Sequence, residues 1–107
     1  MKTAETAHMP SEESVRAALR NVIDPEAGMN IVDLGLVYGI AIAPDSVRVT
    51  MTMTTPACPL SAMIMEDAQR EIRAVTPAAA EIDVQLVWEP PWNASMLSEH
   101  AKEHFGW

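Results

Sequence analysis

The chain has 107 residues and a hydrophobic content of 49%, which suits one domain with a single core and argues against a second domain. Fifteen Asp and Glu residues against seven Lys and Arg residues give a formal net charge of −8, and the basic residues are scattered, so we expect no nucleic-acid partner. No apolar run approaches the roughly 20 residues that span a bilayer, and residues 1–9 lack the apolar core of a secretory signal, so we expect a cytoplasmic protein with no membrane partner.

The N-terminal part predicts a short tail followed by a helix. Residues 1–9 are expected to be a flexible tail, and residues 10–107 are expected to form the single domain. Ser11 is suited to cap a helix that begins with two glutamates, which favour the positive end of the helix dipole. The helix is predicted to run to Asp24, because Pro25 disfavours the helical conformation in the residue before it. Its buried stripe has helical spacing and consists of Val15, Ala18, Leu19, Val22 and Ile23.

Two strands are predicted after a turn at residues 25–28. The first covers residues 37–43, and the second begins after a turn signal at residues 44–46. From residue 47 to residue 54, apolar and polar residues alternate, which is typical of a strand with one face in the core. We expect an antiparallel hairpin whose other face, rich in threonine, points to solvent or to a partner.

A second helix and a third strand follow. The helix is predicted over residues 60–75, with an inner stripe formed by Leu60, Met63, Ile64, Ala68, Ile72 and Val75. Residues 81–87 alternate again, and the helical crossover allows this strand to pair in parallel with the second strand. The expected fold is an α/β (α+β) two-layer sandwich in the order helix-strand-strand-helix-strand. It has a small three-stranded mixed sheet, both main helices on one face, and a short C-terminal helix.

The only cysteine, Cys58, lies between the second strand and the second helix, where Pro59 suits the first helical position. A thiol at such a place is near unpaired backbone N–H groups and the positive end of the helix dipole, and both favour the thiolate. The thiolate is the form that binds metal or attacks an electrophile. The alternative is a buried thiol that acts as a small hydrophobic side chain, and position alone does not separate these two interpretations.

Four motifs occur in a fixed order. They are Asp24-Pro25-Glu26, Asn30-Ile31-Val32-Asp33-Leu34-Gly35-Leu36-Val37, Thr54-Thr55-Pro56-Ala57-Cys58-Pro59-Leu60 and Trp88-Glu89-Pro90-Pro91-Trp92. Over about residues 12–99 the chain thereby resembles the iron–sulfur cluster assembly domain family that includes SufT and PaaD, a family of metal–sulfur cluster biosynthetic proteins. The resemblance implies an adaptor or transient carrier that delivers clusters to client proteins, with Cys58 as its functional thiol. It also implies partners among iron–sulfur assembly factors and apo client proteins.

The resemblance implies supporting roles for other motif residues, namely Asp24, Glu26, Asp33, Thr54, Thr55, Pro56 and Pro59. PaaD-type relatives carry a cysteine-rich extension beyond the tryptophan motif and serve a multicomponent oxygenase. This chain has no second cysteine, which counts against a role as an accessory protein of such an oxygenase. That role and a cluster-free protein-interaction adaptor are the two alternatives to the maturation role.

The number of thiols limits the cofactor chemistry. Iron–sulfur clusters are usually held by about four protein ligands, mostly thiolates, and this chain offers Cys58 alone. We therefore expect a transient cluster or iron at Cys58 and no tightly bound cofactor. Stable coordination would need a client's cysteines, an exogenous thiol, or a second copy of the chain in a homodimer. We do not expect an enzyme. The alternative is a thiol-dependent enzyme, which would need a base beside Cys58, and no sequence feature places one there.

Several other polar residues have two interpretations each. Asp33 interrupts an apolar run and either lies beside the cysteine segment or caps the backbone of its own turn, and the same choice holds for Asp24. Glu26 is interpreted as a motif residue rather than a general base. His100 and His104 are spaced to share a metal, but two histidines near a chain end are more often solvated, and their spacing does not form the HExxH arrangement.

The tryptophan motif is predicted to bind a partner through Trp88, Glu89, Pro90, Pro91 and Trp92. Aromatic residues dominate binding hot spots, and the proline pair lowers the entropy lost on ordering. The alternative is that the two tryptophans seal the edge of the sheet and hold the last helix in place.

Overall fold

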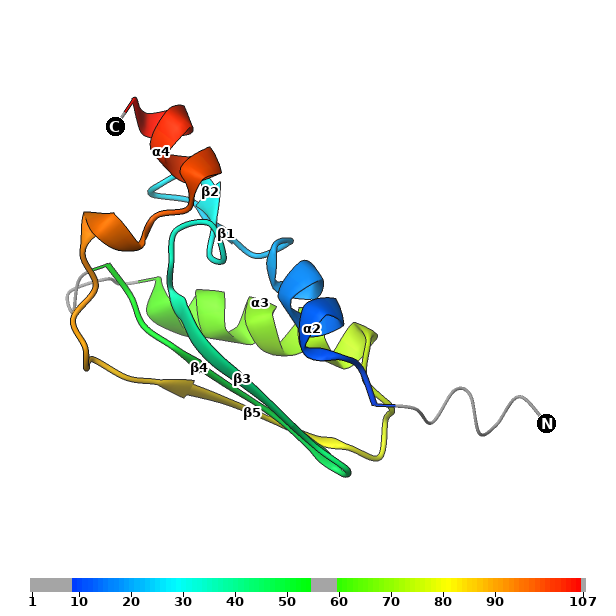
Figure 1. Cartoon of the computed structure of the whole chain (residues 1–107). Helices are drawn as coiled ribbons and strands as arrows, with labels where there is room; N and C mark the ends of the chain where they lie inside the picture. The colour runs from blue at the N-terminus through cyan, green and yellow to red at the C-terminus, as the bar shows by residue number, and fades with distance from the viewer. Residues whose placement is uncertain (1–8, 55–59, 107) are drawn as a thin grey trace.

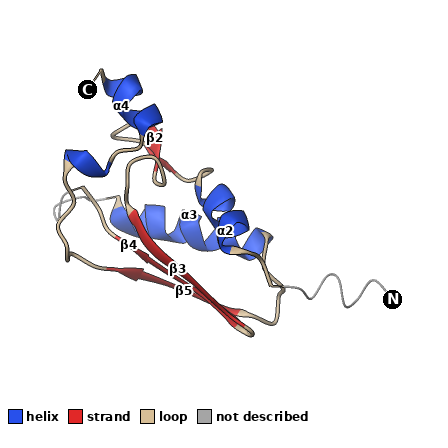
Figure 2. Ribbon diagram, in the orientation of Figure 1, coloured by secondary structure: helices blue, strands red, loops and turns tan. Residues whose placement is uncertain are grey.

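The computed structural model describes residues 9–54 and 60–106, and these form two layers (Figure 1). One layer is a three-stranded sheet, and the two longer helices lie over one of its faces (Figure 2). The elements in chain order are α2 (Glu12–Leu19), β1 (Ile23–Asp24), β2 (Met29–Asn30), β3 (Val37–Ala43), β4 (Ser46–Met51), α3 (Ser61–Ala74), β5 (Glu81–Leu86), the 3-10 helix η1 (Ala94–Met96) and α4 (Glu99–Phe105). The predicted two-layer fold with its short C-terminal helix is confirmed. No described helix is long and apolar enough to cross a bilayer.

The sheet has the strand order β3-β4-β5. Strands β3 and β4 pair antiparallel from Ala43 opposite Ser46 to Val37 opposite Met51, with an irregularity between Val37 and Gly39. Strands β4 and β5 pair in parallel, because α3 returns the chain to the other end of the sheet. The predicted hairpin and parallel crossover are therefore both confirmed.

The first helix is shorter than predicted. It ends at Leu19, and tight turns follow in which the N–H groups of Asn21 and Val22 donate to the carbonyl oxygens three residues earlier, at Ala18 and Leu19. Ile23 consequently leaves the helical stripe, lies in β1 and is 48% exposed. The prediction of a helix to residue 24 was wrong, because β1 and β2 form a small antiparallel ribbon that the chain enters before Pro25.

The second helix buries a narrower stripe than predicted. Ile64, Ala68 and Ile72 are fully buried, as expected from their spacing of four residues. Met63 is 42% exposed, because it lies one residue away from that stripe and faces roughly 100° around the helix. Val75 is 39% exposed, because it is the C-cap residue beyond the last turn.

The core lies between the helices and the inner face of the sheet. It includes Val15 and Leu19 from α2, the stripe of α3, and the alternating side chains Val47, Val49 and Met51 of β4. Thr52, predicted on a face open to solvent or a partner, is instead fully buried. The outer threonine face of β4 is therefore covered where the strand ends.

The C-terminal segment packs back on the loop before β3. Gly35 has a positive φ of 78°, and any Cβ there would overlap the backbone of Met96 in η1. The N–H of Ser98 donates to the Asp33 carbonyl oxygen at 2.8 Å, so the start of α4 is fixed to the same loop. These contacts hold residues 92–98 against residues 33–35.

Candidate functional site

Three elements meet at one end of the sheet, namely the end of β4, the start of α3 and the end of β5. The cysteine segment connects the first two of them in the sequence. The N–H of Val87, after β5, donates to the Met51 carbonyl at the end of β4, at 2.8 Å. Helix α3 runs opposite to the parallel strands β4 and β5, so its first turn lies at this same end (Figure 1). We call the region formed by residues 52–54, 60–63 and 87–88 the thiol end. Cys58, Thr55, Pro56 and Pro59 lie outside the described residues.

The first turn of α3 lacks the usual partners of a helix N-terminus. Its N-cap residue is Leu60, which makes no side-chain cap hydrogen bond, and the turn contains no acidic residue. The other two α-helices are capped by Ser11 and Ser98 and carry glutamate in the first turn. Among residues 9–54 and 60–106, no first-turn or N-cap side chain therefore neutralises the positive end of the α3 dipole, in the helix that directly follows the cysteine segment.

Thr52 is a buried hydroxyl group at the thiol end. Its side chain has no exposed surface, and its Oγ1 has no hydrogen-bond partner among the described residues. Its backbone N–H donates to the Leu36 carbonyl at 2.8 Å. A buried polar atom without a partner costs stability, and such atoms are rare in native proteins. Thr54, two residues later, is exposed.

Asp33 is tied to the C-terminal segment. Its carboxylate accepts a hydrogen bond from the Asn30 side-chain amide at 2.8 Å, and its own N–H donates to the Asn30 side chain at 2.9 Å. Partial burial raises the pKa of Asp33, but hydrogen bonds from Asn30 and Ser98 and the nearby charges of His100 and Arg20 outweigh it and hold the pKa below its ordinary value. In this turn Asn30 caps the N–H of Asp33, and the Asp33 carboxylate accepts from side chains, which differs from the predicted capping of backbone N–H groups by Asp33.

Asp24 and Glu26 belong to the turn between β1 and β2. The buried Asp24 accepts the N–H of Glu26 on its side-chain oxygen at 2.9 Å, and its carbonyl oxygen accepts the N–H groups of Ala27 and Gly28. The Asp24 side chain thus closes its own turn, as the alternative interpretation proposed. The Glu26 side chain is exposed.

The two tryptophans of the closing motif differ in their surroundings. The indole N–H of Trp92 donates to the Leu34 carbonyl, at 2.6 Å, and the ring packs partly buried against the core. Trp88 is 41% exposed at the thiol end, and Glu89, Pro90 and Pro91 are exposed as well. The motif therefore contains one packing tryptophan and one accessible tryptophan, so each interpretation fits one of them.

The segment between the two tryptophans is held by Tyr38 of β3. The Tyr38 hydroxyl donates to the Pro90 carbonyl oxygen at 2.7 Å and lies 3.6 Å from the Met96 sulfur. The peptide bond between Glu89 and Pro90 is cis. Tyr38 therefore fixes the path by which the chain leaves Trp88 and reaches Trp92.

The two histidines considered as metal ligands lie on the C-terminal helix α4. His100 and His104 are exposed on α4, where the His104 ring meets Phe105 edge-on at 5.0 Å. Within residues 9–54 and 60–106, no three His, Cys, Asp or Glu side chains gather in a metal-binding group.

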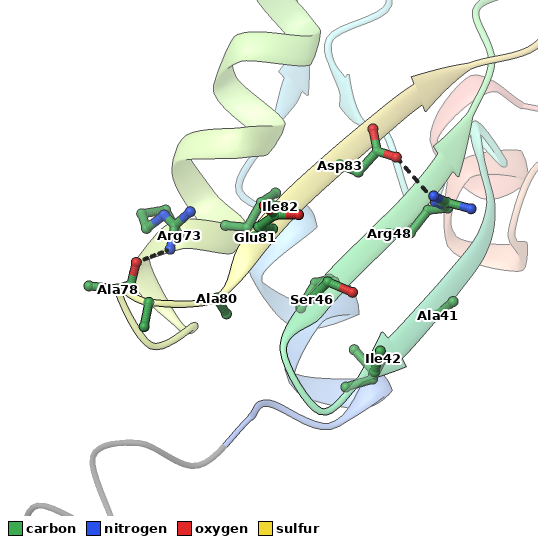
Figure 3. Close-up of a pocket in the computed structure, with 13 residues that line it drawn as sticks. Ala41, Ile42, Ser46, Arg48, Arg73, Ala78, Ala80, Glu81, Ile82 and Asp83 are labelled. Atoms are coloured by element: carbon green, nitrogen blue, oxygen red, sulfur yellow. Dashed lines mark hydrogen bonds and ion pairs between the residues drawn. The ribbon is translucent and has the colours of Figure 1, made fainter.

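A hollow lies at the opposite end of the sheet, beside the tip of the β3–β4 hairpin and the chain that follows α3 (Figure 3). It has a volume of about 870 Å³ and is open and mostly polar. Arg73 donates to the carbonyls of Pro77 and Ala78 at its rim, and Arg48 pairs with Asp83 at 3.1 Å. Both guanidinium groups thus have partners, and the hollow is remote from the thiol end.

The family model described as iron–sulfur cluster assembly protein matches residues 12–84. The chain belongs to this family. It is 38% identical over 96 residues to the Fe-S protein maturation auxiliary factor YitW of Bacillus subtilis, covering 89% of this chain and 93% of that protein. It is 41% identical over 86 residues to the Fe-S protein maturation auxiliary factor SufT of Staphylococcus aureus, covering 79% of this chain and 97% of that protein.

A solved structure supports the family's fold for this chain. The crystal structure of a domain of unknown function from Bacillus anthracis matches with a TM-score of 0.83 and 41% identity. The match covers 89% of this chain and 91% of that chain. The family stretch of residues 12–84 includes Asp24, Asp33 and the cysteine segment, and it ends before Trp88.

Sequence reasoning missed two features of this family member's thiol end. The first is the uncapped start of α3, which Leu60 signals, since Ser, Thr, Asp and Asn are the usual caps. The second is the burial of Thr52. The alternation of residues 47–54 predicts an outward position for this side chain and gives no sign that it is covered. Its burial depends on tertiary packing at the end of the strand.

Proposed function

We propose that this protein is a maturation factor for iron–sulfur proteins that uses Cys58 as a transient ligand or client contact. The observation that supports the proposal most strongly is the first turn of α3, which follows the only cysteine and has neither a side-chain cap nor an acidic residue. Family membership and the similarity to maturation auxiliary factors point the same way.

The chemistry follows from the first backbone N–H groups of α3, which no side chain caps among the described residues, and from the helix dipole. Both stabilise negative charge beside the helix N-terminus, so they favour the thiolate of a preceding cysteine over its thiol. A thiolate binds iron, whereas a neutral thiol does not. The protein thereby presents a metal-binding sulfur without needing a base, and we propose that it acts without catalysing a reaction of its own.

A cluster bound at Cys58 needs further ligands from another molecule. A cluster usually needs about four protein ligands, and one chain supplies one thiolate. A cluster or iron held at Cys58 therefore keeps positions that a client's cysteines can take. In the handover, a client sulfur binds iron in place of the Cys58 sulfur. The client thiol loses its proton to solvent and Cys58 is released as the thiolate, so no oxidant or reductant is needed.

A second candidate function is a cluster-free adaptor that brings clients to the assembly machinery. The exposed Trp88 at the thiol end favours this function, because an accessible tryptophan is a typical recognition residue. In both functions the partners are assembly factors and apo client proteins, and we place the activity in the cytoplasm. The two functions differ in whether Cys58 carries iron.

The test combines a cellular and a chemical measurement on Cys58→Ser. The proposal predicts that iron–sulfur client activity falls in cells with Cys58→Ser and is normal with the control variant Ala79→Ser, which changes an exposed residue at the opposite end of the sheet. Anaerobic incubation with iron and sulfide should give cluster absorption with the wild-type protein and a client peptide, and none with Cys58→Ser. Normal client activity with Cys58→Ser would refute the proposal, whereas a cellular defect without any cluster absorption would select the adaptor.

A further inference from the structure

The two outer strands of the sheet differ in their protection against pairing with another chain. Strand β5 carries two acidic residues, Glu81 and Asp83, and the polar Gln85. Strand β3, with the sequence VYGIAIA, is the longest strand and contains no charged residue. Natural proteins usually guard an outer strand with charges, prolines, bulges or a covering element, because its free N–H and C=O groups invite another strand.

Only the first residues of β3 show such a device. The irregularity between Val37 and Gly39 interrupts regular pairing at that end, and from Gly39 to Ala43 the strand is regular. Among the described residues, no backbone hydrogen bond reaches the outer side of this stretch. Figure 3 shows β3 outermost in the sheet, with Ala41 and Ile42 on it.

The side chains on this strand permit close approach of another strand. Ala41 is exposed, and the space where a Cβ of Gly39 would be is open. Ile40 and Ile42 lie on the other face and pack against the core. A neighbouring strand with small residues on one face and β-branched residues on the other would continue both layers.

The strand that best meets this description is β3 itself. A strand paired antiparallel with its own copy makes the same contacts in both directions, which gives a closed two-fold interface. Two copies, each with a formal charge of −8, repel one another, and the repulsion is weakest where a strand carries no charge. We infer that β3 of one chain pairs antiparallel with β3 of a second chain, centred near Ala41, and joins the two sheets into one.

This arrangement has a consequence for the thiol end, and only this consequence depends on the proposed function. Val37 lies opposite Met51, so the start of β3 marks the thiol end. Antiparallel strands have their starts at opposite ends, so the two thiol ends of the dimer face away from each other. The dimer then has two separate thiols, and the missing ligands of each must come from a client rather than from the second copy.

The test is sedimentation velocity over a series of protein concentrations, with Ala41→Lys and the matched control Gln85→Lys. Both variants place the same charge on an exposed strand position, one on each outer strand. We expect the wild-type protein, Gln85→Lys and Cys58→Ser to dimerise alike, and Ala41→Lys to dimerise at least tenfold more weakly. A wild-type protein that stays monomeric up to its solubility limit would overturn the inference, as would equal behaviour of the two lysine variants.

A cross-link protects the test against a variant that fails to fold. In the Cys58→Ser background, Ala41→Cys should form an intermolecular disulfide on mild oxidation, and Gln85→Cys should not. Equal cross-linking of the two positions, or none at either, would contradict the pairing of β3. Because this background lacks Cys58, the result is independent of whether the proposed maturation function is correct.

Discussion

At the scale of single residues, the two tryptophans of one motif differ, because Trp92 packs against the core and Trp88 is exposed. Replacing Trp92 with alanine removes the hydrogen bond to the Leu34 carbonyl and opens a cavity at the core, so we predict a loss of roughly 2–4 kcal/mol in the free energy of unfolding. Urea denaturation measures this. The matched variant Trp88→Ala should lose less than about 1 kcal/mol, because its side chain is exposed.

The same pair of variants tests client recognition. Trp88→Ala should capture fewer apo clients in an affinity experiment while remaining folded, since accessible tryptophans often dominate binding. Undiminished capture by Trp88→Ala would remove the recognition role from the motif. A Trp92→Ala protein as stable as wild type would equally contradict the packing role.

Replacing Thr52, unlike replacing Trp92, is predicted to raise the free energy of unfolding. Valine has the shape of threonine without the hydroxyl, so Thr52→Val removes a buried polar atom that has no partner in the described part of the chain. We predict that the free energy of unfolding rises by about 1 kcal/mol in urea denaturation. Thr50→Val, at a half-buried position of β4 two residues earlier, serves as the control and should change stability little. A clear loss of stability in Thr52→Val would show that the hydroxyl is satisfied in the folded protein.

Asp33 predicts a pH dependence of stability. Its native pKa lies below the ordinary value of 3.8, so the folded protein prefers the ionised carboxylate more strongly than the unfolded chain does. The stabilisation is complete above the unfolded pKa and is lost as the pH falls from about 4 through the native pKa. Asp33→Asn should therefore lose stability at pH 7 and flatten the acid limb of the stability curve. An unchanged acid limb would contradict this assignment.

At the scale of elements, the start of α3 is the feature that links the fold to the chemistry. Ala62→Glu places a carboxylate in its first turn, where it competes for the positive potential that favours the thiolate. We predict that this variant slows alkylation of Cys58 at pH 7 by about two- to fivefold, as expected for an interaction of about 0.3–1 kcal/mol. Ala74→Glu adds the same charge to the last turn and should leave the rate unchanged. Equal rates in the two variants would show that the helix dipole does not act on the thiol.

Elements with a strong period in the sequence were predictable. The alternation along β4 and the spacing in α3 gave the hairpin, the crossover and both layers, because these patterns directly reflect one buried face. The ribbon of β1 and β2 has two residues in each strand and no period to detect. The roles of Trp92 and Tyr38 depend on contacts with residues more than 50 positions away, so no local pattern could separate packing from recognition.

At the scale of the whole molecule, the sheet separates two ends. One end gathers the close of β4, the start of α3 and the exit of β5, and the other carries the hairpin tip and the open hollow (Figure 1). The C-terminal segment ties residues 92–98 to the loop before β3 and so fixes the path from Trp88. In the proposed function, the accessible Trp88 at this end and Cys58 serve the same client.

The pH dependence of Cys58 alkylation, measured on the folded protein and on the same protein in urea, tests most directly whether this end presents a thiolate. A free cysteine has a pKa of about 8.5. We predict that the folded protein reacts faster than the unfolded chain near neutral pH. As the pH is raised, its rate should reach a plateau at a pH below the ordinary cysteine pKa. A folded protein that reacts more slowly than the unfolded chain at every pH would show a shielded thiol and would contradict the proposed role of Cys58.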